Sequence, residues 1–216
     1  MRGVYFGDYH TVNDWGLILS SKKINPPTPK IITVDIEGRD GSLDLSRALT
    51  GDMTYDDREA SFSFLVTNGT QSDREYMIRT IVNAIHGQRL KIIEPDFLDL
   101  YLLGECTVSN IVSDKAYGSF DVKAVCEPYR YYITETVRTI TASATPTDIV
   151  LTNTGRKMVT PTITVSDSVD LVIDNTRVSL SAGTYKLTAL RLSPGANTLT
   201  VNGSGTVTFT YREAVL

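Results

Sequence analysis

The sequence contains few of the residues on which enzyme sites are usually built. It has two cysteines (Cys106 and Cys126) and two histidines (His10 and His86) among 216 residues. Two cysteines are too few for a disulfide scaffold or a tetrahedral zinc site. No apolar run approaches the roughly 20 residues needed to cross a bilayer, and no block of Lys and Arg offers a nucleic-acid phosphate surface. These absences favour a binding or structural protein over an enzyme.

Threonine and charge divide the chain into two parts. Thr accounts for 19 of the 83 residues from 134 to 216, but for only 9 of the first 133. The net charge is −5 over residues 1–133 and +1 over residues 134–216. Because both properties change near Tyr132, we predict two domains, residues 1–133 and residues 134–216.

The first part is predicted to be mainly β with one α-helix. Residues 31–36 are rich in β-branched side chains, and residues 60–66 alternate apolar and small polar side chains, so both are expected to be strands. Ser72 and Glu75 form a candidate capping box before a helix that ends at Gly87. An apolar stripe at helical spacing is expected to pack this helix against the sheet: Ile78, Ile81, Val82 and Ile85.

The second part is predicted to be all-β. Residues 169–173 and 177–180 flank Asp174 and Asn175, a candidate hairpin turn. Residues 198–201 and 206–211 flank a second turn, residues 202–205, whose side chains tolerate positive φ. Short alternating strands at this spacing indicate a small sandwich or jelly roll with Thr on its solvent face.

Few side chains suggest catalysis or metal binding. Both cysteines lie in or at the end of apolar strands, where a free thiol usually behaves as a buried hydrophobe. Two groups of acids, at 35, 37, 40 and 44 and at 52, 56, 57 and 59, fit no calcium loop. They are interleaved with Arg39, Arg47 and Arg58, which favours ion pairs in loops or at a subunit contact. We therefore predict no catalytic residue, no cofactor and no metal site.

Aromatic side chains leave one binding function open. The second part has few of them, chiefly Tyr185, Phe209 and Tyr211, and no Trp. A carbohydrate-binding module that recognises host cell-surface glycan through Tyr185 and Tyr211 is the alternative function, since tyrosine rings can stack on a ligand.

A series of motifs, in order and spacing, gives the chain a resemblance to a known family. They are Phe6-Gly7-Asp8-Tyr9-His10-Thr11, Asp14-Trp15-Gly16-Leu17, the segment 35–45, Tyr55-Asp56-Asp57-Arg58-Glu59, Tyr101-Leu102-Leu103-Gly104-Glu105 and Cys126-Glu127-Pro128-Tyr129-Arg130-Tyr131. With these motifs, residues 1–133 resemble the distal tail proteins of long-tailed, non-contractile bacteriophages. Residues 134–216 resemble the galectin-like β-sandwich attached to such proteins, most clearly at residues 159–165.

The resemblance implies a structural virion protein at the distal end of the tail, assembled in the bacterial cytoplasm. Six ring-forming domains of β-sandwich type would build a ring through which viral DNA passes without specific binding. The tail-tube protein would contact one face of the ring and the tail-tip hub or tail-associated lysin the other, with a receptor-binding protein as a further partner and no membrane contact.

Two features of the residues suit such a ring. Ring closure requires contacts between two different surfaces of one fold, and we expect charged turns to set that register through Arg39, Asp40, Arg58 and Glu59. A net negative subunit would also repel the phosphates of DNA in the lumen.

Overall fold

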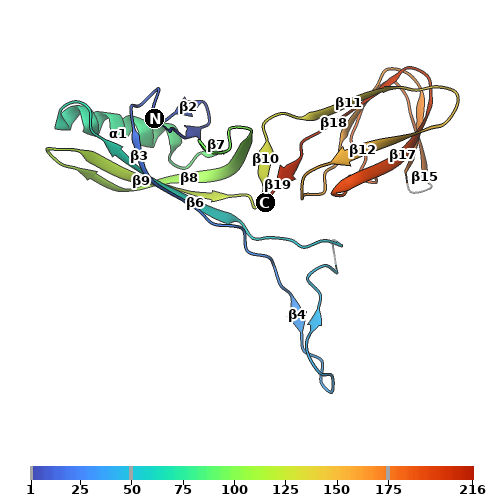
Figure 1. Ribbon diagram of the computed structural model, residues 1–216, viewed down its shortest axis with the longest axis horizontal. Coiled ribbons are helices and arrows are strands. Elements are labelled where there is room, and N and C mark those ends of the chain that lie inside the picture. The colour runs from blue at the N-terminus through green and yellow to red at the C-terminus, as the bar shows by residue number, and fades with distance from the viewer. Residues whose placement is uncertain (1, 49–50, 174–175) are drawn as a thin grey trace. The chain divides into compact units, whose positions relative to one another are not determined.

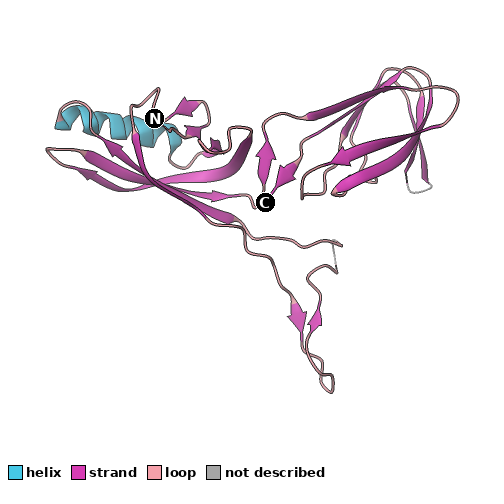
Figure 2. Ribbon diagram, viewed as in Figure 1, coloured by secondary structure: helices cyan, strands magenta, loops and turns pink. Residues whose placement is uncertain are grey.

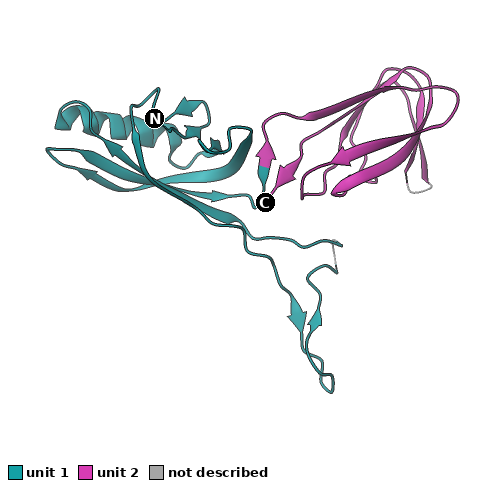
Figure 3. Cartoon of the chain, in the orientation of Figure 1, with its two compact units in different colours: residues 1–130, 216 teal, residues 131–215 magenta. Residues whose placement is uncertain are grey.

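The computed structural model describes residues 2–48, 51–173 and 176–216, and the chain forms two compact units (Figure 3). Unit 1 comprises residues 1–130 with Leu216, and unit 2 comprises residues 131–215. The division after Arg130 lies close to the change in composition near residue 133. The predicted turn at Asp174 and Asn175 lies outside the described residues.

Unit 1 is built around one antiparallel sheet (Figures 1 and 2). Its strands run in the spatial order β2-β1-β7-β8-β9-β6-β3. They are β1 (Tyr5–Phe6), β2 (Tyr9–His10), β3 (Ile18–Ile24), β6 (Arg58–Val66), β7 (Arg89–Ile93), β8 (Leu100–Ser113) and β9 (Gly118–Cys126). The sheet is asymmetric, because β3 is a seven-residue edge strand and the other edge is the two-residue β2.

The core of unit 1 follows from alternation along β6 and β9. Phe62 and Phe64 of β6 are buried together with Phe120 of β9, while the residues between them face the other side of the sheet. Phe6 meets Phe62 edge to face with ring centroids 5.5 Å apart, an arrangement that the ring quadrupoles favour. One face of the sheet is therefore apolar, and the other is left polar.

Helix α1 (Gln71–Ile85) packs on the apolar side of the sheet, and the predicted stripe of Ile78, Ile81 and Ile85 is buried there. The predicted capping box is wrong by two residues. Thr70 is the N-cap and accepts a hydrogen bond from the backbone N–H of Asp73, whose carboxylate accepts the Thr70 N–H in return. The mainly-β fold class with one helix is confirmed for the described residues.

Unit 2 is a sandwich of two four-stranded antiparallel sheets. One has the order β11-β18-β13-β16 and the other β12-β17-β14-β15. The strands are β11 (Thr136–Thr141), β12 (Thr147–Asn153), β13 (Thr162–Val165), β14 (Val169–Ile173), β15 (Thr176–Leu180), β16 (Gly183–Tyr185), β17 (Gly195–Gly203) and β18 (Thr206–Tyr211). Two short strands, β10 (Arg130–Tyr132) and β19 (Ala214–Val215), pair with each other.

The sandwich core takes side chains from both sheets, including Ile163 and Phe209 from one and Leu171 and Leu199 from the other. Threonines line the outer faces, where the Thr139 and Thr208 hydroxyls lie 3.0 Å apart across paired strands. This is the arrangement that the Thr-rich alternation predicted.

Across the described part of the chain, no helix is both long and apolar enough to span a bilayer.

Candidate functional site

Residues 25–57, which we call the arm, join β3 to β6 and leave the sheet as a long hairpin (Figure 1). Near the base of the arm, the outgoing and returning segments are held together by a hydrogen bond from the Lys30 N–H to the Thr54 carbonyl and by an isolated β-bridge between Pro29 and Tyr55. Farther out, β4 (Thr33–Val34) pairs with β5 (Leu43–Asp44). The strand predicted over residues 31–36 is therefore reduced to two residues in a narrow hairpin.

Aliphatic side chains of the arm are exposed to solvent. Every residue from 28 to 42 is exposed, and Ile31 retains 69% of its accessible surface. The exposed aliphatic residues of the arm are Ile31, Ile32, Val34, Ile36 and Leu45. Several exposed aliphatic side chains within one segment are characteristic of a surface that contacts another protein.

The arm also carries the net charge of the whole protein. Residues 25–57 contain seven acids and three bases, a net charge of −4, which equals the charge of the full chain. All other residues together are neutral. The acidity assigned to residues 1–133 is therefore a property of one hairpin, and it is not distributed over the sheet.

The four predicted interface residues do not share one surface. Arg39 and Asp40 are exposed in the turn at the tip of the arm, where Gly38 and Gly41 adopt positive φ. Glu59 is exposed on the polar face of β6. These three stay predictions as interface residues.

Arg58 corrects the expectation of a charged turn, because it is the first residue of β6 and only 2% exposed. Its Nε and Nη2 atoms have no hydrogen-bond partner among the described residues. Burial, with a contribution from the Arg130 charge, lowers the pKa of Arg58 to about 10. A guanidinium in this position is not available to a neighbouring subunit.

The buried acid near Arg58 is already paired with other cations. Glu94, itself buried, accepts from Lys22 Nζ at 2.8 Å and from Arg130 Nη2 at 2.9 Å. Arg58 is thus held in the body of unit 1 with its charge incompletely compensated, which costs folding free energy.

The two cysteines are buried in unit 1, as predicted for small hydrophobes. Burial raises the pKa of both the Cys106 and the Cys126 thiol to about 12. Both are therefore protonated at neutral pH and lack the thiolate that nucleophilic catalysis requires.

The tyrosines proposed to contact glycan are differently placed. Tyr211 is 5% exposed, and its hydroxyl donates to the Thr152 carbonyl at 2.7 Å. Burial also raises the pKa of Tyr211 above its ordinary value. The expectation that Tyr211 offers a stacking surface is therefore wrong. Tyr185 is partly exposed, and its hydroxyl donates to the Ser181 carbonyl at 3.0 Å.

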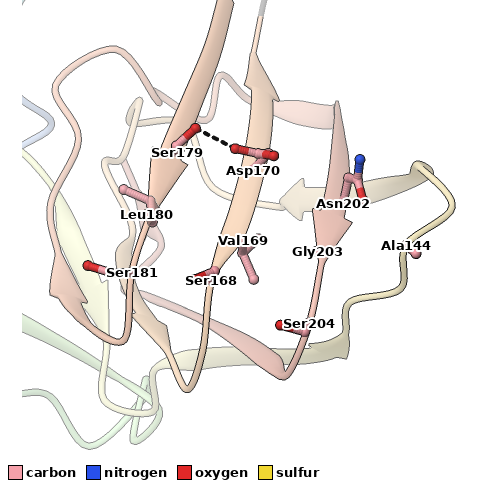
Figure 4. Close-up of a pocket in the computed structure, with 10 residues that line it drawn as sticks. All are labelled: Ala144, Ser168, Val169, Asp170, Ser179, Leu180, Ser181, Asn202, Gly203 and Ser204. Carbon is pink, nitrogen blue, oxygen red and sulfur yellow. Dashed lines mark hydrogen bonds between the residues drawn. The ribbon is translucent and has the colours of Figure 1, made fainter.

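Unit 2 instead contains a polar depression of about 680 Å³ (Figure 4). Strands β14, β15 and β17 and the adjoining loops supply its polar lining, which consists of Ser168, Asp170, Ser179, Ser181, Asn202 and Ser204. None of these residues was a sequence-based site candidate. A signal existed in the polar residues that alternate with core residues along these strands, but their grouping depends on the register between strands.

No protein-family model and no curated protein matches the sequence. By structure, the chain is similar to the Dit protein (gp 19.1) of phage SPP1, described as a paradigm of the hub adsorption apparatus in phages that infect Gram-positive bacteria. That match has a TM-score of 0.72 and 14% identity and covers 100% of both chains. Two structures of the activated phage P2 baseplate, with calcium and with strontium, match with a TM-score of 0.41 and 8% identity, over 99% of this chain and 98% of the other. The chain has the fold of a phage distal tail protein, as its motifs predicted.

Proposed function

We propose that this chain, which has the distal tail protein fold, is a non-enzymatic structural subunit of a phage tail. In this proposal six copies form a ring that joins the tail tube to the tip or baseplate. The single observation that carries the proposal is the match to SPP1 Dit, because it extends over both units and the full length of each chain.

Two surfaces with exposed apolar side chains, the arm and a groove beside α1, lie at opposite ends of one sheet. This arrangement agrees with a head-to-tail ring. The arm leaves at the end where Arg58 of β6 pairs with Cys126, and Val66 at the other end pairs with Gly118. Near that second end, α1 and β8 form a groove of about 310 Å³ lined by Ile78, Val82 and Ile111. Nine strand residues separate the two ends by about 30 Å. Different surfaces at opposite ends are what a closed ring requires of its subunit.

The charges on the polar face of the sheet agree with the proposal that DNA passes through the ring without binding to it. Strands β3, β6, β8 and β9 present charges of both signs on this face: Lys23, Lys123, Glu59, Glu105 and Asp121. Such a mixture has no basic stripe to hold phosphates. The negative charge of the chain lies in the arm. It would repel DNA in the lumen only if the arms pointed into the lumen, and our proposal does not include that arrangement.

We place the tail-tube protein on one face of the ring and the tip hub or tail-associated lysin on the other. A receptor-binding protein is a further partner. The arm, with its exposed aliphatic residues and net charge of −4, suits a partner surface that is apolar at its centre and basic at its rim.

Electron microscopy of the full chain mixed with the tail-tube protein tests this function. We expect a six-fold ring at the end of the tube. Tubes that end without added density, or a ring of another symmetry, would contradict the proposal. Assembly on the tube is the appropriate readout because a ring subunit can remain monomeric until its template is present.

A further inference from the structure

We propose that the polar depression in unit 2 binds a neutral, polyhydroxylated ligand, a saccharide, in addition to any role of the chain in a ring. The depression has a volume of about 680 Å³, within the range of small-molecule sites. The site differs from the tyrosine platform expected from the sequence, and it is formed by the sheet β12-β17-β14-β15.

Three polar side chains lie in one row across neighbouring strands. Asp170 of β14 is paired in register with Asn202 of β17 on one side and Ser179 of β15 on the other. Residues opposite one another in paired strands project to the same face. Their neighbours Val169, Leu171 and Val201 point into the sandwich core, so the row faces solvent.

Asp170 is held in a fixed orientation. One carboxylate oxygen accepts from the Ser179 hydroxyl and the other from Arg177 Nη2 (Figure 4 shows the contact with Ser179). These hydrogen bonds also hold the pKa of Asp170 below its ordinary value. Each carboxylate oxygen keeps a further lone pair, so the oriented group can still accept a hydrogen bond from a ligand hydroxyl.

Other polar groups of the depression have hydrogen-bonding capacity to spare. The Asn202 amide and the Ser168 hydroxyl make no side-chain hydrogen bond to the described residues, and both border the depression. An amide offers donors and an acceptor, and a hydroxyl offers both. Together with Asp170 they can satisfy adjacent hydroxyl groups, each of which needs to donate and to accept.

At one end of the depression, the turn after β17 lies against the segment that precedes β14. The backbone N–H of Ser204 donates to the Ser168 carbonyl at 2.9 Å. Gly203 has a φ of 138°, and a Cβ there would clash with that same carbonyl oxygen. Glycine at this position thus permits the close approach that places Ser168 and Ser204 at one end of the depression.

The charge balance selects among ligand classes. Among the described residues that line the depression, Asp170 alone is charged, and Arg177 compensates it from the neighbouring strand. An anionic ligand would meet the carboxylate, and a metal ion would lack ligands, since no group of three His, Cys, Asp or Glu occurs among the described residues. The neutral, hydroxyl-rich lining therefore fits a saccharide.

Saturation-transfer NMR of the full-length protein with D-glucose, D-galactose and N-acetylglucosamine tests the proposal. We expect saturable binding of at least one sugar, with a Kd on the order of 1 mM. Asn202→Ala and Asp170→Asn should each weaken it about tenfold by removing hydrogen bonds to the ligand. Thr198→Ala is the matched control, because Thr198 is exposed on the same face of β17 and lies outside the depression.

Three results would overturn the proposal. They are a lack of saturable signal from all three sugars, variants at 170 and 202 that bind as the wild type does, and an equal loss in Thr198→Ala. Tighter binding of glucose 6-phosphate than of glucose would contradict the assignment to a neutral ligand. Circular dichroism of each variant confirms that a loss of binding does not come from unfolding.

Discussion

The arm and the strand that follows it show how similar sequence patterns can have opposite structural outcomes. Residues 31–36 and residues 60–66 are both rich in residues that favour strands. The second segment buries Phe62 and Phe64 in the core of unit 1, whereas the first is exposed along its whole length. Strand propensity thus indicates extended backbone, and the partner that covers it has to come from elsewhere in the fold or from another chain.

The same comparison locates the charge. The arm has a net charge of −4 and the remaining residues sum to zero. In a folded monomer, acidic groups beside exposed aliphatic side chains keep such a hairpin in solution. In an assembly, the same charges favour basic partners and oppose contacts with other arms.

The largest expected difference between arm and body lies in thiol reactivity. Cys106 and Cys126 are fully buried with a pKa of about 12, whereas a cysteine replacing Ile36 in the arm would be exposed. At pH 8, we expect the thiol introduced by Ile36→Cys to react with a thiol reagent at least about a thousandfold faster than Cys106 and Cys126. The two buried thiols should react only when the protein unfolds.

Reagent absorbance against time measures these rates, and protein unfolded in guanidinium chloride provides the control in which every thiol reacts at once. Rapid reaction of the wild-type thiols in buffer would contradict a rigid body around the core of unit 1.

Two arginines, one buried in the body and one exposed in the arm, are expected to differ in their contribution to the free energy of unfolding. Arg58→Glu would place a carboxylate at a buried site, and we expect it to lower the free energy of unfolding by at least about 3 kcal/mol. Arg58→Met should be neutral or stabilising, because it removes an incompletely paired charge. Arg39→Glu, in the exposed tip, should change stability by less than about 0.5 kcal/mol.

Urea denaturation of the three variants measures these differences. A mild effect of Arg58→Glu would show that the site is open to solvent and would restore Arg58 as a candidate for subunit contacts.

The smallest predicted difference concerns the start of α1 in the body. Thr70→Ala removes the N-cap hydrogen bond to Asp73 and should lower the free energy of unfolding by about 1 kcal/mol. Ser72→Ala lies within the first turn of the helix and should have an effect of less than about 0.5 kcal/mol. Thermal unfolding of the pair checks the cap, and the reverse order would support the capping box first expected at Ser72 and Glu75.

Local patterns predicted elements well where a single periodicity settled them. The stripe of Ile78, Ile81 and Ile85 identified the buried face of the helix, and Thr alternation identified the outer faces of unit 2. The cap was misplaced because Thr70 and Ser72 are both followed three residues later by an acid. Tyr211 was misassigned although it alternates in phase with the buried Val207 and Phe209, a signal that the sequence did contain.

Other features depend on contacts that no local pattern encodes. Arg58 was expected at the surface because arginine usually lies there, but it begins β6, the strand next to the edge strand β3, and it lies on the same face as the buried Phe62 and Phe64. The polar row of Asp170, Ser179 and Asn202 arises from register between strands up to 32 residues apart in sequence. Such groupings require the fold before they can be identified.

Replacement of residues 30–54 by a short Gly-Ser linker tests most directly whether the arm is an element of assembly attached to a self-sufficient body. The bridge between Pro29 and Tyr55 stays in place at the base. Electron microscopy with the tail-tube protein, together with thermal unfolding, provides the readout. We predict that the shortened chain unfolds cooperatively at nearly the wild-type temperature and forms no ring. A ring formed without the arm, or a body that no longer folds, would contradict this account.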